Sequence, residues 1–128
     1  MAESNREKGL KKRAELFGER DSLERIEQLR QFDEGFARLL TDVCFGDVWS
    51  RPGLPTKIRS MITVAALITL GRLPELKNHM VGALRAGVTE QELKEIVVHL
   101  SQYAGIPAAV QAVRVFNDAQ REFQKIER

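Results

Sequence analysis

The two histidines of this 128-residue chain are the side chains best suited to acid–base chemistry. His79 follows Glu75 by four residues, so a helix would place both on one face, one turn apart. A carboxylate there favours the protonated imidazole, and histidine exchanges a proton near neutral pH. The pair is therefore a candidate general acid or base. A core histidine with one satisfied hydrogen bond would explain the same spacing.

The second histidine has polar neighbours at the same spacing on both sides. Glu95 precedes His99 by four residues and Tyr103 follows it by four, so the three can form a polar stripe along one helix face. Such a stripe is typical of a pocket wall or a subunit contact, and equally of solvated surface. Neither histidine belongs to an H-x-x-x-H or H-E-x-x-H pattern, so we expect no metal site.

The segment from residue 46 to residue 59 interrupts the helical pattern and contains Trp49, Arg51 and Arg59. Loops that combine arginine with aromatic residues are typical of binding sites. The planar guanidinium suits a carboxylate or phosphate, which predicts a small anionic molecule as partner. Alternatively, each arginine pairs with a carboxylate of the chain itself, and Trp49 covers the core.

A single cysteine, Cys44, excludes an intrachain disulfide, a CxxC redox pair and a multi-cysteine zinc site made from this chain alone. It falls on the apolar face of a predicted helix, where free cysteines usually behave as small hydrophobic residues. A thiol peroxidase that depends on Cys44 is disfavoured because the chain has no resolving cysteine. Serine-hydrolase, phosphate-loop and dinucleotide motifs are also absent from the sequence.

Every long segment has a helical period, which predicts an all-α fold of about six helices to position these side chains. The firmest boundary is a capping box made by Thr89 and Glu92. We expect a helix to end near each of Gly18, Gly46, Gly71, Gly87 and Gly105. The expected helices cover residues 6–17, 31–45, about 55–70, about 74–86, a segment from Thr89 toward Gly105, and a segment from Pro107 onward.

Four finer expectations concern burial and caps. In the helix over 31–45, the 3, 4 spacing predicts one buried face formed by Phe32, Phe36, Leu39, Leu40, Val43 and Cys44. The segment from Met61 to Leu70 is apolar nearly all round, which predicts a central helix covered on several sides. Ser22 or Asp21 is expected to cap whatever follows Gly18, and Val110, Val113 and Phe116 mark the apolar face of the last helix.

The composition is that of an ordinary soluble protein, with 43% apolar and 30% charged residues. Its 20 basic and 18 acidic residues nearly cancel and form no basic run, so nucleic acid is not an expected partner. The longest apolar stretch is about half of what a membrane span needs. We expect a cytoplasmic protein of one domain over residues 1–128, with a helical arm over 1–21 and a core over 31–123.

Four segments together carry a family resemblance. They are Gly46-Asp47-Val48-Trp49-Ser50-Arg51-Pro52-Gly53-Leu54, then Arg59-Ser60, then Glu75-Leu76-x-x-His79 with Ala83-Leu84-x-x-Gly87, and Tyr103-Ala104-Gly105-x-Pro107-Ala108-Ala109. In this order and at these separations, they resemble the carboxymuconolactone decarboxylase family, from about Phe32 to Val113. The resemblance implies an alkylhydroperoxidase-D-like helical fold that assembles into rings of three or six subunits.

The resemblance also implies an activity. A related branch of peroxidases uses a CxxC pair before the histidine, but Arg72 and Glu75 stand at those positions here, so the decarboxylase branch is favoured. The family's named reaction removes CO2 from 4-carboxymuconolactone without a cofactor, in aromatic-compound degradation. In that reading His79 supplies the proton or stabilises the dienolate, Glu75 orients His79, and Arg51 and Arg59 hold the carboxylates.

In the same reading Trp49 walls the site, and His99 and Tyr103 are further donors. Two other possibilities stay open. One is an enzyme of the family that acts on another lactone or keto acid, and the other is a noncatalytic oligomer that binds a ligand in the same place. Decarboxylases of the protocatechuate pathway would be expected to carry a histidine shortly after the glycine that ends the first helix, whereas Gly18 is followed here by Glu-Arg-Asp-Ser.

Overall fold

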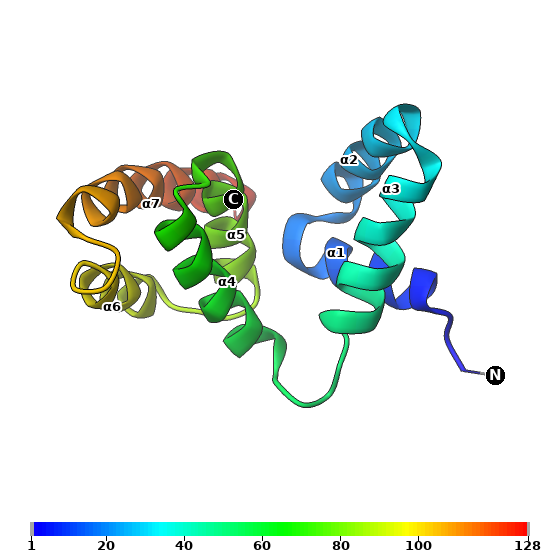
Figure 1. Cartoon of the computed structure of the whole chain (residues 1–128), viewed down its shortest axis with the longest axis horizontal. Coiled ribbons are helices and arrows are strands. Elements are labelled where there is room, and N and C mark those ends of the chain that lie inside the picture. Colours follow the sequence, from blue (N-terminus) through cyan, green and yellow to red (C-terminus); the bar gives the residue numbers. More distant parts are fainter. Residues whose placement is uncertain (1, 128) are drawn as a thin grey trace. The chain divides into compact units, whose positions relative to one another are not determined.

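A computed structural model describes residues 2–127, and in this range the regular structure is entirely helical (Figure 1). The all-α prediction is therefore confirmed. Contacts group the chain into two compact units, Met1–Thr56 and Lys57–Arg128. That the whole chain acts as one domain, with the arm and core expected above, stays a prediction.

The first unit contains α1 (Asn5–Phe17), α2 (Glu19–Phe32), α3 (Glu34–Arg38) and the π-helix η1 (Leu39–Val48). The predicted end of α1 at Gly18 is confirmed, since Gly18 has a φ of 84° that favours glycine. The predicted cap by Ser22 or Asp21 is wrong. Helix α2 begins directly after Gly18, which leaves Ser22 buried inside the helix.

Two glycines allow α1 and η1 to pack with their backbones in contact. A Cβ atom added to Gly9 would lie 1.9 Å from the Thr41 carbonyl oxygen, and one added to Gly46 would lie 2.0 Å from the Asn5 carbonyl oxygen. Gly46 was expected to end a helix, but η1 continues through it to Val48. The absence of a side chain at Gly46 thus serves packing against α1.

The predicted buried face of residues 31–45 is wrong for most of its members. Phe32 is 78% exposed, and Phe36, Leu39 and Val43 are also exposed. The reason is that no single α-helix covers this range: α2 ends at Phe32, a new helix begins after Asp33, and η1 follows with a different period. Within η1 the buried residues are Thr41, Phe45 and Gly46.

The second unit is built from α4 (Thr56–Leu70), whose first residue lies at the border between the units, α5 (Leu73–Arg85), α6 (Glu90–Leu100) and α7 (Ile106–Glu127). The predicted breaks at Gly71, Gly87 and Gly105 are confirmed, and all three have positive φ. The capping box of Thr89 and Glu92 is also confirmed, with both hydrogen bonds present.

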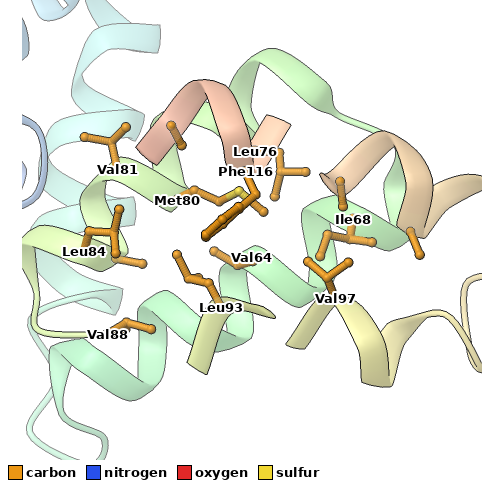
Figure 2. Close-up of a cluster of buried hydrophobic side chains, with 14 residues drawn as sticks. Val64, Ile68, Leu76, Met80, Val81, Leu84, Val88, Leu93, Val97 and Phe116 are labelled. Atoms are coloured by element: carbon orange, nitrogen blue, oxygen red, sulfur yellow. The ribbon is translucent and has the colours of Figure 1, made fainter. Parts of the chain in front are cut away.

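The core of the second unit gathers side chains from all four of its helices (Figure 2). Phe116 of α7 lies beside Met80 of α5, while Leu93 of α6 and Val64 of α4 face them from the other side. Helix α4 is less covered than predicted: Val64 and Ile68 are buried, but Ile62 is 54% exposed. On α7, Val110 and Val113 are exposed, because the buried stripe runs instead through Ala109, Ala112, Phe116 and Ala119.

Candidate functional site

A groove of about 530 Å³ runs along α4 and α6 within the second unit. Its lining is mostly apolar, with the polar side chains of α6 among it: Met61, Ile62, Ala65, Gln91, Glu92, Glu95, Ile96, His99 and Leu100. Ligand sites typically combine such an apolar surface with a few polar groups. The groove therefore has the mixed lining that small-molecule sites share.

Two members of the predicted polar stripe, Glu95 and His99, line this groove. The Glu95 carboxylate accepts a hydrogen bond of 3.2 Å from the Gln91 side-chain amide. The His99 ring stacks on Tyr103 with the ring centroids 5.1 Å apart and the planes at 30°. Tyr103 belongs to the turn after α6 and is 77% exposed. The stripe thus exists, and its two N-terminal members face the groove.

An ion pair between α4 and α6 lies at one end of the groove. The Lys57 ammonium lies 3.2 Å from the Glu92 carboxylate, which joins the start of α4 to the start of α6. The Thr89 N–H donates a hydrogen bond of 2.9 Å to the same carboxylate. This backbone hydrogen bond, helped by Lys57, lowers the pKa of Glu92. Glu92 is accordingly ionised at neutral pH, where it pairs with Lys57 between the starts of the two helices.

Glu75 and His79 lie one turn apart on α5, as the spacing predicted. Glu75 is exposed and His79 is half-buried, next to the fully buried Leu76 and Met80. The lining of the groove between α4 and α6 includes His99 but not His79. The groove therefore contains one of the two histidines.

The predicted arginines lie on different units. Arg59 is half-buried on α4, and its carbonyl oxygen accepts a hydrogen bond of 2.8 Å from the Thr63 hydroxyl. Arg51 is exposed and belongs to the first unit. The backbone N–H of Arg51 donates a hydrogen bond of 3.2 Å to the Val48 carbonyl, which fixes the backbone where the loop begins.

Trp49 packs inside the first unit. Its ring stacks on Phe45 at a centroid distance of 5.5 Å and an interplanar angle of 17°, and the side chain is 8% exposed. The backbone N–H of Trp49 donates a hydrogen bond of 2.9 Å to the Cys44 carbonyl, five residues earlier, which is the pattern of a π-helix. The Ser50 hydroxyl donates to the Phe45 carbonyl at 2.7 Å. These two hydrogen bonds, the ring contact and the Arg51 backbone bond to Val48 together anchor the start of the loop.

Sequence reasoning missed Arg13, the most buried cation in the described part of the chain at 4% exposure. Its guanidinium carbon lies 5.2 Å from the Phe17 ring centroid and 4.9 Å from that of Phe45. Burial, and secondarily the charge of Arg25, lower the pKa of Arg13 to about 10. The only signal in the sequence was Phe17 one helical turn after Arg13.

Cys44 is half-buried beside this arginine, and burial raises the pKa of its thiol, although Arg13 opposes the change. A raised pKa keeps the sulfur protonated at neutral pH, and the thiolate is the reactive form. This weighs against a peroxidase that depends on Cys44.

Residues 2–127 contain neither a metal-type cluster nor a helix that could cross a membrane. No group of three or more His, Cys, Asp or Glu side chains in this range is arranged to hold a metal ion. No described helix combines the length and apolar character needed to cross a membrane.

Comparison with known proteins identifies relatives over most of the chain. It is 41% identical over 113 residues to 4-carboxymuconolactone decarboxylase of Acinetobacter baylyi, a match that spans 88% of this chain and 84% of the relative. It is 34% identical over 109 residues to nitrosuccinic acid decarboxylase npaB of Metarhizium robertsii, spanning 85% and 76%. Residues 34–118 match the carboxymuconolactone decarboxylase family. The chain belongs to the carboxymuconolactone decarboxylase family.

Proposed function

We propose that this protein is a carboxy-lyase that removes CO2 from a small anionic substrate, with 4-carboxymuconolactone as the first candidate and with no cofactor. One observation carries the proposal: two relatives that are named as decarboxylases align with most of the chain, although they are named for different acids. Both names denote carboxylic acids, which agrees with a chain whose loop after η1 presents the exposed Arg51.

The chemistry requires a place for one electron pair. When the bond between the ring carbon and the carboxylate breaks, CO2 leaves and its bonding electrons spread through the unsaturated ring onto the lactone oxygen. Hydrogen-bond donors and cations stabilise this dienolate. A proton then adds at carbon and gives the enol-lactone. Electrons and protons balance without an oxidant or a metal.

In the proposed mechanism, His79 on α5 delivers that proton and Glu75 orients its imidazole. Arg51 and Arg59 bind the carboxylates, because a guanidinium can donate two parallel hydrogen bonds to one carboxylate. His99 lines a groove that does not include His79, and Trp49 is buried against Phe45, so neither these two residues nor Tyr103 is given a contact with the substrate. The half-buried position of His79 supports its role, since partial burial limits access of water to a proton donor.

A second substrate class follows from the other relative. Nitrosuccinic acid is a dicarboxylate in which a nitro group, in place of a lactone, can accept the electron pair. The 34% identity to a nitrosuccinic acid decarboxylase makes such an acid the alternative substrate. The two candidates share what the arginines would recognise, a pair of carboxylates, and differ in the group that holds the charge.

We infer that the protein works in the cytoplasm as a homo-trimer or homo-hexamer, in the degradation of aromatic compounds. Support for assembly comes from large apolar side chains left exposed on the second unit, among them Ile62, Val98 and Val113. Exposed apolar surface of this kind is typical of protein contacts.

The experiment is direct. Purified protein is mixed with 4-carboxymuconolactone, and in parallel with nitrosuccinate, while CO2 release and loss of substrate are recorded. Turnover of either acid that survives EDTA and gel filtration supports a cofactor-independent carboxy-lyase. Activity that disappears with EDTA and returns with a metal would contradict the cofactor-independent mechanism. Saturable binding of both acids without CO2 release would instead identify a noncatalytic binding protein.

A further inference from the structure

A buried arginine stands at one end of a row of three side chains in the first unit. The Arg13 guanidinium carbon lies 4.9 Å from the centroid of the Phe45 ring, and that ring stacks on Trp49 at 5.5 Å. The Phe17 ring packs edge-to-face against the Phe45 ring, with an interplanar angle of 82° and centroids 5.9 Å apart. The row joins α1 to the last turn of η1 and to the residue that follows it.

The buried charge of Arg13 calls for an explanation. Its side chain is 4% exposed, its Nε has no hydrogen-bond partner, and it forms no ion pair among residues 2–127. Removing a charge from water costs free energy that an apolar residue of similar size would not cost. The contacts that do stabilise this cation are the two aromatic rings. Its position is therefore tied to the orientation of those rings.

The rings in turn fix the start of the loop that carries Arg51. Phe45 contacts Trp49 through its ring and accepts the Ser50 hydroxyl at its carbonyl oxygen. The next residue, Arg51, is bound to the same helix end through Val48. A rotation of Phe45 would consequently move Trp49 and change the direction in which the backbone leaves η1.

We propose that Arg13 is a positioning residue for substrate recognition: through Phe45 and Trp49 it orients the loop from which Arg51 binds a substrate carboxylate. A cation above a ring face favours one orientation of that ring, whereas an aliphatic side chain packs against several. The pKa of Arg13, lowered only to about 10, leaves the guanidinium charged at neutral pH. The link to substrate rests on the proposed role of Arg51, while the effect on Trp49 does not.

The first test uses fluorescence, because Trp49 is the only tryptophan in the chain. In the wild type we expect blue-shifted emission that acrylamide quenches weakly. Arg13→Met keeps an unbranched stem without the charge, and should shift the emission to the red and increase quenching about threefold, in line with loss of one desolvated cation–π contact. Arg13→Lys keeps the charge and should restore most of the wild-type signal. Arg20→Met, an equal change on the exposed face of α2, is the control.

Circular dichroism shows whether each variant folds. If Arg13→Met does not fold, Phe45→Leu is used in its place in the fluorescence test. This change breaks the row between Arg13 and Trp49 with an apolar residue, and it should give the same red shift. Unchanged emission in a folded Arg13→Met or Phe45→Leu variant would overturn the proposal. So would a wild-type spectrum typical of an indole in water.

The second test uses kinetics with the substrate that the wild type decarboxylates. Arg13→Met should raise KM about tenfold and change kcat by less than about twofold, since it weakens binding equally in the ground and transition states. Arg13→Lys should stay within about threefold of the wild-type KM. An altered emission with an unchanged KM would refute the link to Arg51. If the wild type releases no CO2 from any acid, the proposed function fails, whereas the fluorescence result still decides the role of Arg13.

Discussion

At the scale of single residues, the proposed chemistry depends most on His79. His79→Asn keeps a polar side chain of similar size but cannot deliver a proton at neutral pH. We expect it to lower kcat for CO2 release by about 10²- to 10⁴-fold, the usual contribution of a general acid. The measurement is CO2 release at saturating substrate. A change of less than about threefold would remove His79 from the mechanism.

Arg51 should act on binding. Its exposed position means that Arg51→Ala is expected to leave the fold intact and to raise KM by roughly 10- to 100-fold, the cost of losing a charge-assisted hydrogen bond. Arg114→Ala, on the exposed side of α7, is the matched control and should change KM by less than about twofold. Equal effects of both substitutions would mean that only the overall charge of the protein attracts the substrate.

Residue spacing predicted some of these positions well and others poorly. Glu95 and His99 are four residues apart in α6 and Tyr103 follows in the turn directly after it, so local spacing sets most of the geometry of the stripe. The buried Arg13 depends on Phe45, which is 32 residues away and reaches it only after α1 and η1 have packed. A charged side chain gives no local sign that two rings will cover it.

At the scale of elements, helix packing is least tolerant at Gly9 and Gly46, where α1 and η1 meet. Gly46→Ala would bring a Cβ to 2.0 Å from the Asn5 carbonyl oxygen, so α1 must move away from η1. We expect the free energy of unfolding to fall by about 3 kcal/mol, at the upper end of overpacking effects. Gly53→Ala adds a Cβ with nothing within 4 Å and should stay within about 0.5 kcal/mol of the wild type in urea unfolding.

The junction of α4 and α6 should respond to pH. Because the pKa of Glu92 is lower in the folded state, its carboxylate stabilises the fold at neutral pH, and this contribution is lost as the pH falls below the usual value of 4.5 and through the lowered pKa. Glu92→Gln should therefore reduce stability at neutral pH and leave it nearly unchanged in acid. Urea titrations of both proteins at a series of pH values would measure this difference. An equal loss of stability at every pH would exclude the carboxylate as the cause.

Helix ends were easier to predict than helix faces, and the reason is physical. Thr89, Glu92 and the glycines at 71, 87 and 105 act through backbone geometry within a few residues. The buried faces of α4, α7 and residues 31–45 depend on which neighbour covers them, and η1 changes the period itself. Apolar residues that recur every three or four positions cannot indicate that a turn of the helix contains an extra residue.

At the scale of the whole molecule, the exposed apolar side chains predict self-association. Light scattering coupled to gel filtration should give a mass of three or six chains, each of 14.5 kDa. Ile62→Glu, on the exposed side of α4, should reduce the assembly if that side forms a contact, because a charge buried at an interface is costly. Thr69→Glu, on an exposed polar position of the same helix, is the control. A monomer of 14.5 kDa in the wild type would contradict the ring assembly.

The π-helix η1 also determines how the chain tolerates changes of length. Each residue of an α-helix advances the chain by about 100° around the axis, so deleting one residue from η1 would restore ordinary α-helical hydrogen bonds and turn everything after it. Trp49 would then leave Phe45, and the loop would emerge on another side. Substitutions at the exposed Asp47 and Val48 should therefore be tolerated, while single-residue deletions between Leu39 and Val48 should not.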